Sequence, residues 1–174
     1  MITSLVAAIG RDRQLGLGGR LPWRLREDMK NFRDLTKGHH VLMGRKTFQS
    51  LAGALPARDN LVVSGDRSII PRGFYLFASP LEARDFAEER GEPELFIIGG
   101  ASIYEFFMVR RLVDRMYLTE VDYRGEADVF FPKFSDSDWE TRKTQYFEEN
   151  GENDHGGCIR TLVRRETAAS STSL

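Results

Sequence analysis

Residues 96–104 read Phe96-Ile97-Ile98-Gly99-Gly100-Ala101-Ser102-Ile103-Tyr104, a buried strand that passes through a glycine pair into the start of a helix. The arrangement returns in Val41-Leu42-Met43-Gly44-Arg45-Lys46-Thr47, where a strand and a glycine precede two cations and a hydroxyl. Adjacent glycines let a backbone approach a ligand closely, and the free N–H groups of a helix start attract phosphate. Cations at a helix start oppose its macrodipole, so a bound polyanion would explain Arg45 and Lys46.

Neither stretch carries a standard nucleotide fingerprint. Residues 96–104 lack the G-x-G-x-x-G spacing, and residues 41–47 do not match the Walker pattern G-x-x-x-x-G-K-[ST]. An ordinary dinucleotide fold and a nucleoside triphosphatase are therefore the weaker interpretations. Ser64-Gly65-Asp66-Arg67 follows the next strand and can add a hydroxyl and another cation to the same anion site.

Strand-like and helical segments alternate along most of the chain. Apolar runs typical of strands occupy residues 2–9, 40–43, 60–64, 74–77, 95–98, 115–121, 139–147 and 158–164. Helical patterns occupy residues 25–36, 46–52, 80–90 and 101–110. Such alternation favours an α/β fold with a mostly parallel central sheet flanked by helices. The last two strands follow each other without a helix, so we expect a C-terminal antiparallel hairpin at one edge.

Length and composition suit one domain, which we place at residues 1–165, followed by a disordered tail at residues 166–174. The 174 residues include 25 basic and 26 acidic side chains, a balance that gives no electrostatic case for nucleic acid or a membrane surface. The single cysteine, Cys158, excludes an internal disulfide and fits a reducing compartment. Residues 1–9 lack the features of a signal peptide, and no apolar run approaches membrane-spanning length. We therefore expect a cytoplasmic protein, and a monomer because no exposed apolar stripe is evident.

The histidines do not predict a metal site. His39 and His40 are adjacent, so on a strand they would point to opposite faces. His155 lies far away in the sequence, and no cysteine or glutamate completes a zinc tetrad.

Asp28 is a carboxylate on an otherwise apolar helix face. Turning residues 25–36 at about 100° per residue places the apolar residues on one arc: Leu25, Met29, Phe32, Leu35 and Thr36. Asp28 falls between Phe32 and Leu35 with no basic residue beside it. An unpaired buried charge is costly, and Glu27 could already complement the helix dipole while facing water. The pattern predicts a pocket carboxylate that binds a ligand able to donate two hydrogen bonds.

Two loops are candidates for gating a ligand. Residues 10–24 are rich in glycine and end in Pro22-Trp23, which predicts a mobile segment with a rigid aromatic at its end. Residues 125–134 link two strands and carry Asp128. Long loops beside a rigid sheet often control access to a site.

Taken together, several motifs resemble those of the dihydrofolate reductase family, in its short bacterial form. They are Ala7-Ala8, Gly16, Leu21-Pro22-Trp23, the helix carrying Asp28 and Phe32, Met43-Gly44-Arg45-Lys46-Thr47, Leu55-Pro56-Ala57-Arg58, Ile98-Gly99-Gly100 and Tyr117-Leu118-Thr119. The resemblance covers residues 1 to about 165. It implies NADPH-dependent reduction of 7,8-dihydrofolate to tetrahydrofolate for one-carbon metabolism, with hydride transfer to pterin C6 and protonation of N5. It also implies sensitivity to antifolate inhibitors.

The resemblance further implies roles for individual residues. Asp28 matches the pterin-binding carboxylate, Arg58 the clamp on the glutamate α-carboxylate, and Arg45 with Ser64 the contacts to the cofactor's 2′-phosphate. The implied catalytic set is Asp28, Trp23, Leu21 and Thr119. The implied substrate contacts are Val6, Ala8, Asp28, Met29, Phe32, Leu51, Leu55, Arg58, Ile98, Tyr104 and Thr119. The implied cofactor contacts are Ala8, Leu15, Gly16, Gly44, Arg45, Lys46, Thr47, Ser64, Gly65, Ile98, Gly99, Gly100, Ala101, Ser102, Ile103 and Tyr104.

Two alternatives remain open from the sequence. The pyrimidine reductase of riboflavin synthesis resembles this fold and also uses NADPH, but Arg58 with Leu55 fits a folate tail better than a ribose phosphate. A non-catalytic nucleotide-binding protein would keep the anion sites alone, and it would need neither Asp28 nor Trp23.

Overall fold

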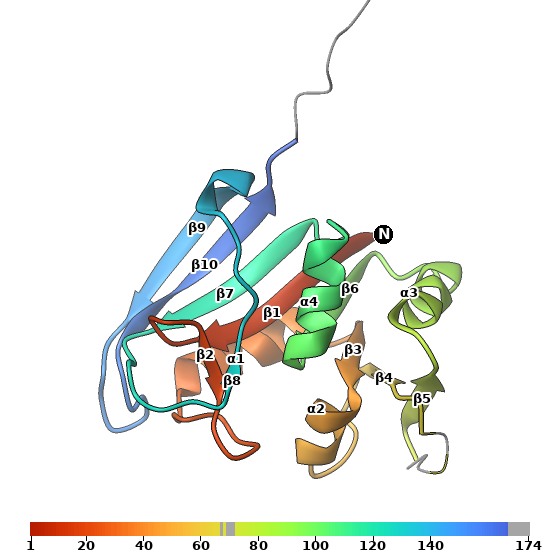
Figure 1. The fold of residues 1–174 in the computed structure, drawn as a ribbon, viewed down its shortest axis with the longest axis horizontal. Helices are drawn as coiled ribbons and strands as arrows, with labels where there is room; N and C mark the ends of the chain where they lie inside the picture. Colours follow the sequence, from red (N-terminus) through yellow and green to blue (C-terminus); the bar gives the residue numbers. More distant parts are fainter. Residues whose placement is uncertain (67, 69–71, 167–174) are drawn as a thin grey trace, which may run out of the picture.

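The central sheet runs in the order β5-β4-β3-β6-β1-β7-β10-β9 in a computed structural model that describes residues 1–66, 68 and 72–166 (Figure 1). Its strands are β1 (Ile2–Ile9), β3 (His40–Gly44), β4 (Asp59–Val63), β5 (Phe74–Phe77), β6 (Glu94–Gly99), β7 (Arg115–Val121), β9 (Trp139–Phe147) and β10 (Gly157–Arg164). Neighbours from β5 to β7 pair in parallel. β10 pairs antiparallel with both β7 and β9, which confirms the predicted C-terminal hairpin at one edge.

Helices cover both faces of the sheet. They are α1 (Arg26–Thr36), α2 (Arg45–Ser50), α3 (Pro80–Glu89) and α4 (Ala101–Val109), with a short 3₁₀ turn at Asp136–Asp138. Every predicted strand and helix is present within two residues of its expected bounds. The part of the tail expected at residues 167–174 lies outside the described residues.

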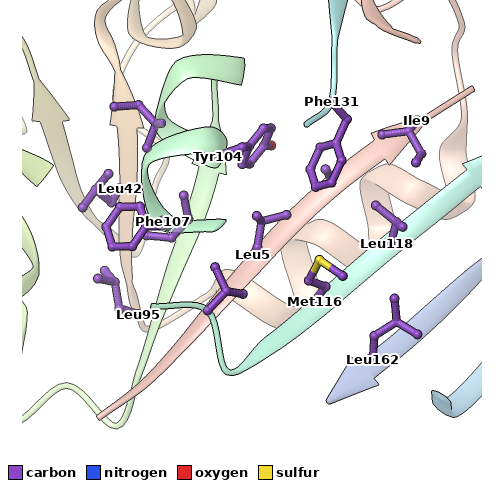
Figure 2. Packing of buried hydrophobic residues seen from close by; sticks show 14 of the residues in the cluster. Leu5, Ile9, Leu42, Leu95, Tyr104, Phe107, Met116, Leu118, Phe131 and Leu162 are labelled. Atoms are coloured by element: carbon purple, nitrogen blue, oxygen red, sulfur yellow. The ribbon is translucent and has the colours of Figure 1, made fainter. Parts of the chain in front are cut away.

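Alternation along β1 separates the two hydrophobic layers, because successive side chains of a strand point to opposite faces. Leu5, Ala7 and Ile9 pack in the layer under α3 and α4, where Figure 2 shows Phe107 between Leu42 and Leu95. Val6 belongs to the opposite layer, where it packs with partly buried side chains of α1 and α2. The mostly parallel sheet is thus buried on both faces, as such sheets require.

The two loops singled out in the sequence are joined by a small second sheet. β2 (Gln14–Gly16) pairs antiparallel with β8 (Val129–Phe130). Next to this pair, Asp128 donates its backbone N–H to the Gly16 carbonyl at 2.9 Å and accepts the Gly18 N–H on its carboxylate at 2.9 Å. The sequence predicted two separate mobile loops and did not predict this link.

The prediction that His39 and His40 point to opposite faces is wrong. β3 begins only at His40, so His39 precedes the strand and does not follow its alternation. Both rings bond the carboxylate of Glu92, which is 6% exposed: His39 through Nδ1 at 2.7 Å, and His40 through Nδ1 and its backbone N–H. Burial acts to raise the pKa of Glu92, but the hydrogen bonds from His39 and His40 outweigh it and lower that pKa.

Replacing Glu92 should destabilise the fold in a pH-dependent way. A carboxylate with a lowered folded-state pKa adds stability above its ordinary pKa, and this stability is lost as the pH falls through the folded-state value. We expect Glu92→Gln to reduce the free energy of unfolding by about 1.5–3 kcal/mol at pH 7, the range for hydrogen bonds to charged groups. Thermal unfolding from neutral pH downward would show the difference from wild type shrinking with acid. The exposed neighbour Glu88→Gln is the matched control, and an equal effect of both variants would contradict the assignment.

Candidate active site

The parallel strands β1, β3, β6 and β7 end at one edge of the sheet, and the predicted site residues gather there. Ala8 near the end of β1 lies opposite Thr119 of β7, and Met43 of β3 lies opposite Gly99 of β6. Ligands of open α/β sheets bind in the crevice outside the carboxyl ends of the strands. This edge is therefore the candidate site.

Asp28 meets Thr119 across this crevice. The Thr119 hydroxyl donates a hydrogen bond to Asp28 Oδ1 at 2.6 Å, and Thr119 itself is buried. Burial raises the pKa of Asp28, and the hydrogen bond from Thr119 only partly opposes this shift. The predicted apolar arc of α1 thus does present the Asp28 carboxylate to the site. Its partner is the hydroxyl of Thr119, which lies 91 residues further along the chain.

Tyr104 forms the neighbouring wall. It is 4% exposed, and its hydroxyl donates to the Val6 carbonyl at 2.7 Å. Burial, and after it the negative charge of Asp28, raise the pKa of this hydroxyl. Tyr104 therefore stays neutral, and its hydrogen bond to Val6 holds α4 against β1.

The residues of the 10–24 loop take different positions. Trp23 is buried and packs edge-on against Tyr123, with 5.3 Å between the ring centroids. Its indole Nε1–H has no acceptor within the part of the chain that the structure describes. Leu21, placed in the same functional set, is 48% exposed. Trp23 therefore offers a buried donor near Ala8, with which it shares a cluster, whereas Leu21 lies at the surface.

Met29 was placed on the apolar arc by its helical spacing, but its side chain is not buried as Thr36 is. Met29 is 50% exposed and borders a surface groove with Arg26 and Glu152. Leu25 is not part of the helix, so the helical arc is centred on Asp28, Phe32 and Leu35. Met29 lies about 100° from Asp28, at the margin of that arc.

Arg58 is held at the far end of α1. It donates through Nη1 to Thr36 Oγ1 at 3.1 Å and through Nε to the Pro56 carbonyl at 2.9 Å, and its guanidinium lies over the Phe32 ring. Burial and the positive charge of Arg33 lower the pKa of Arg58. A bound carboxylate would relieve this repulsion. The role of the Thr36 hydroxyl was missed by sequence reasoning, which placed Thr36 with the apolar residues because of its helical spacing.

The starts of α2 and α4 meet beside the glycine pair. Their N-cap residues, Gly44 and Gly100, offer no side chain to the free helix N–H groups. Gly99 has φ +124°, and a Cβ there would lie 3.2 Å from Thr47 Oγ1. A Cβ on Gly44 would come within 2.9 Å of Ile103. This close approach leaves backbone N–H groups of two helices available to an anion, the arrangement that phosphate binding uses.

A small pocket continues from this point along α2. Its lining residues are Arg45, Phe48, Val62, Ser64, Asp66 and Leu76. Arg45 and Ser64, predicted to act together, do lie together there. The pKa of Asp66 is lowered by hydrogen bonds from Ser68 and also by the charge of Arg45, so one carboxylate shares the pocket with the cation. Arg67, proposed as a second cation, lies outside the described residues.

Among the described residues, no group of three or more His, Cys, Asp or Glu side chains could hold a metal ion. No helix in the described ranges is long and apolar enough to cross a membrane.

Removing the charge of Asp28 should stabilise the fold. An aspartate whose folded-state pKa is raised favours the folded state less and less as the pH climbs from its ordinary pKa to the raised value. We expect Asp28→Asn to unfold about 2–4 °C above wild type at pH 7, a shift that corresponds to about 1 kcal/mol in a domain of this size. The gain should shrink as the pH approaches about 4, near the ordinary aspartate pKa. Calorimetry of Asp28→Asn beside the exposed Asp34→Asn checks this, and a melting temperature below that of Asp34→Asn would contradict it.

Known proteins with the same sequence and structural features form one family. A family model described as dihydrofolate reductase matches residues 1–164. Dihydrofolate reductase HdrB of Haloferax volcanii is 37% identical over 143 residues, 78% of this chain and 73% of that protein. Dihydrofolate reductase of Bacillus subtilis is 35% identical over 136 residues, 78% of this chain and 79% of that protein.

A solved structure shares the whole fold. Dihydrofolate reductase from Enterococcus faecalis, in complex with NADP(H) and RAB-propyl, matches with a TM-score of 0.87 at 25% identity. The match covers 95% of this chain and 97% of that one. The chain belongs to the dihydrofolate reductase family.

Proposed function

We propose that Asp28 and Thr119 recognise the pterin ring of 7,8-dihydrofolate, which enzymes of this family reduce to 5,6,7,8-tetrahydrofolate with NADPH. The observation that carries this assignment is the partly buried Asp28 carboxylate, whose side-chain partner among the described residues is the Thr119 hydroxyl at 2.6 Å. A pterin presents an amino group and a neighbouring ring nitrogen side by side. A carboxylate can accept hydrogen bonds from both, which supplies the second partner that a buried charge requires.

Asp28 acts as an anchor and an electrostatic group. A carboxylate that holds the amino end of a pterin cannot also reach N5 on the other side of the ring system, so a water must deliver that proton. The negative charge of Asp28 raises the basicity of the bound ring, and the free Nε1–H of Trp23 can hold a water beside it. When bound, NADPH supplies the hydride; the protein positions the ring and excludes bulk water.

The remaining substrate contacts follow from the layer below α1. We propose that the ring and benzoyl group pack against apolar side chains, namely Val6, Ala8, Phe32, Leu51, Leu55 and Ile98, with Met29 at the exposed margin. Arg58, oriented by Thr36 and Pro56, binds the α-carboxylate of the glutamate tail. Planar guanidinium groups suit carboxylates because they can donate two parallel hydrogen bonds.

For the cofactor, we propose that the two helix starts hold its phosphates. Lys46, Thr47 and the backbone of residues 99–103 surround the bridging phosphates, and Arg45 with Ser64 binds the 2′-phosphate. The supporting observations are the uncapped starts of α2 and α4 and the shared pocket of Arg45 and Ser64. Backbone groups of Ala8 and Leu15, beside Gly16, fix the nicotinamide carboxamide, and Tyr104 backs that ring.

We also propose that the enzyme acts in the cytoplasm as a monomer. Cys158 is the only cysteine of the chain, and it is free. Burial and the neighbouring Glu120 raise the pKa of its thiol, so it stays protonated. A single free and protonated thiol fits a reducing compartment. Neither alternative raised by the sequence, the pyrimidine reductase or the non-catalytic nucleotide binder, has an observation that favours it.

The decisive variant is Asp28→Asn. Following NADPH absorbance with dihydrofolate, we expect its kcat to fall by about a hundredfold or more, because the ring loses both its charged acceptor and its electrostatic activation. NADPH binding should be unchanged, and a diaminopyrimidine antifolate that inhibits wild type should lose potency. Wild-type turnover by Asp28→Asn at neutral pH would show that the assignment is wrong, and no NADPH oxidation by wild type with dihydrofolate would refute the activity.

Arg45→Gln should weaken the binding of NADPH but not that of NADH. Losing one charge-assisted bond to a phosphate costs about 1.5–3 kcal/mol, so we expect KM for NADPH to rise about 10–100-fold. NADH lacks the 2′-phosphate, and its KM should stay within about twofold. Steady-state kinetics with both cofactors supplies an internal control. Equal losses for NADPH and NADH would place Arg45 away from the 2′-phosphate.

A further inference from the structure

Asn153 is a buried polar residue in the loop between β9 and β10. It is 2% exposed, although it lies in a turn of polar residues. Its backbone N–H donates to Asn150 Oδ1 at 2.9 Å, its carbonyl accepts the Asn150 N–H at 2.9 Å, and its Nδ2 donates to the Glu148 carbonyl at 3.3 Å. These bonds fix the loop around the side chain and leave Asn153 Oδ1 pointing outward from it.

Asn153 Oδ1 accepts the backbone N–H of Glu27 in the first turn of α1, at 3.2 Å. The preceding N–H, of Arg26, donates to the Glu152 carbonyl at 3.2 Å. The N-cap residue of α1 cannot accept these N–H groups, because it is Leu25, whose side chain has no acceptor. Two of the free N–H groups of α1 are therefore satisfied by a loop more than 120 residues away along the chain.

The same loop holds the chain just before the helix. Asp154 accepts the Arg24 N–H on Oδ2 at 2.7 Å and donates its own N–H to the Arg24 carbonyl at 2.9 Å. Leu25 and Asn153 form an antiparallel bridge. The start of α1 is thus clamped on both sides of Leu25, and Asp28 is the next residue after the one that Asn153 binds.

The loop is also tied to the strand that carries Thr119. It leads directly into β10, which begins at Gly157 and pairs with β7 so that Ile159 lies opposite Thr119. One hairpin therefore contacts both sides of the 2.6 Å hydrogen bond between Thr119 and Asp28. Its strand β10 pairs with β7 at Thr119, and its Asn153 binds Glu27, the residue before Asp28.

We propose that Asn153 is a positioning residue for Asp28: its side-chain oxygen fixes where α1 begins and so sets the distance from the Asp28 carboxylate to Thr119 and to the pterin. The proposal rests on the role proposed above for Asp28. Asn153 does not reach the substrate. It acts through the helix start, and small displacements of a group that orients a substrate lower turnover strongly.

The test compares Asn153→Ala with Asn153→Asp and Glu152→Gln. Asn153→Ala removes the acceptor, and we expect kcat/KM for dihydrofolate to fall about tenfold or more while KM for NADPH stays within about twofold. Asn153→Asp keeps an acceptor for the Glu27 N–H, favoured by the helix dipole, and loses only the donor to the Glu148 carbonyl, so it should restore most of the activity. Glu152→Gln removes only the exposed ion pair with Arg26, keeps the backbone bond, and should behave as wild type.

The outcomes separate positioning from general stability. If Asn153→Ala raises both KM values alike, or if Asn153→Asp fails to recover activity while it melts like wild type, the proposal is overturned. If Asn153→Ala does not fold, Asn153→Ser makes the same comparison, because its shorter side chain withdraws the oxygen from Glu27. Wild type and Asp28→Asn are assayed alongside. If wild type is active, Asp28→Asn is inactive and Asn153→Ala has wild-type kinetics, the positioning role of Asn153 is wrong and the proposed function still holds.

Discussion

One hydrogen bond, from the hydroxyl of Thr119 to the carboxylate of Asp28, connects the two halves of the site. It joins a helix to a strand that comes much later in the chain, and it stabilises a charge that burial disfavours. The other features depend on this constraint. α1 must lie against the sheet at the level of Thr119, and the apolar layer around Phe32 and Val6 must exclude water without displacing the carboxylate.

A different, steric constraint applies where α2 and α4 begin. Helices α2 and α4 begin so close together that side chains at Gly44 and Gly99 would collide with Ile103 and Thr47. Charge recognition is placed further out, where Arg45 and Ser64 border a pocket that also contains Asp66. In the function proposed here, backbone groups of the two helix starts would bind the bridging phosphates, and the side chains of Arg45 and Ser64 would distinguish one cofactor from another.

Local patterns in the sequence were enough to predict the sheet, the helices and the carboxylate on α1, because each depends on periodicity within a short segment. Thr119 could not be placed beside Asp28 by such patterns, since their contact depends on the register of β1 with β7. Met29 shares the helical spacing of the apolar residues of α1 but is exposed, because periodicity gives the direction of a side chain on the helix and not what covers it. The pairing of β2 with β8 and the cap supplied by Asn153 join segments far apart in the chain, and neither has a periodic signal.

The pair His39 and His40 with Glu92 lies where β3 and β6 begin, at the opposite edge of the sheet from Asp28. Two carboxylates with shifted pKa values therefore lie toward opposite edges of the sheet: the pKa of Asp28 is raised, and the pKa of Glu92 is lowered. Acid tolerance and the chemistry of the site are consequently separable properties of this molecule. We therefore expect substitutions around Glu92 to change how the stability of the fold depends on pH, while Asp28 and Thr119 stay untouched.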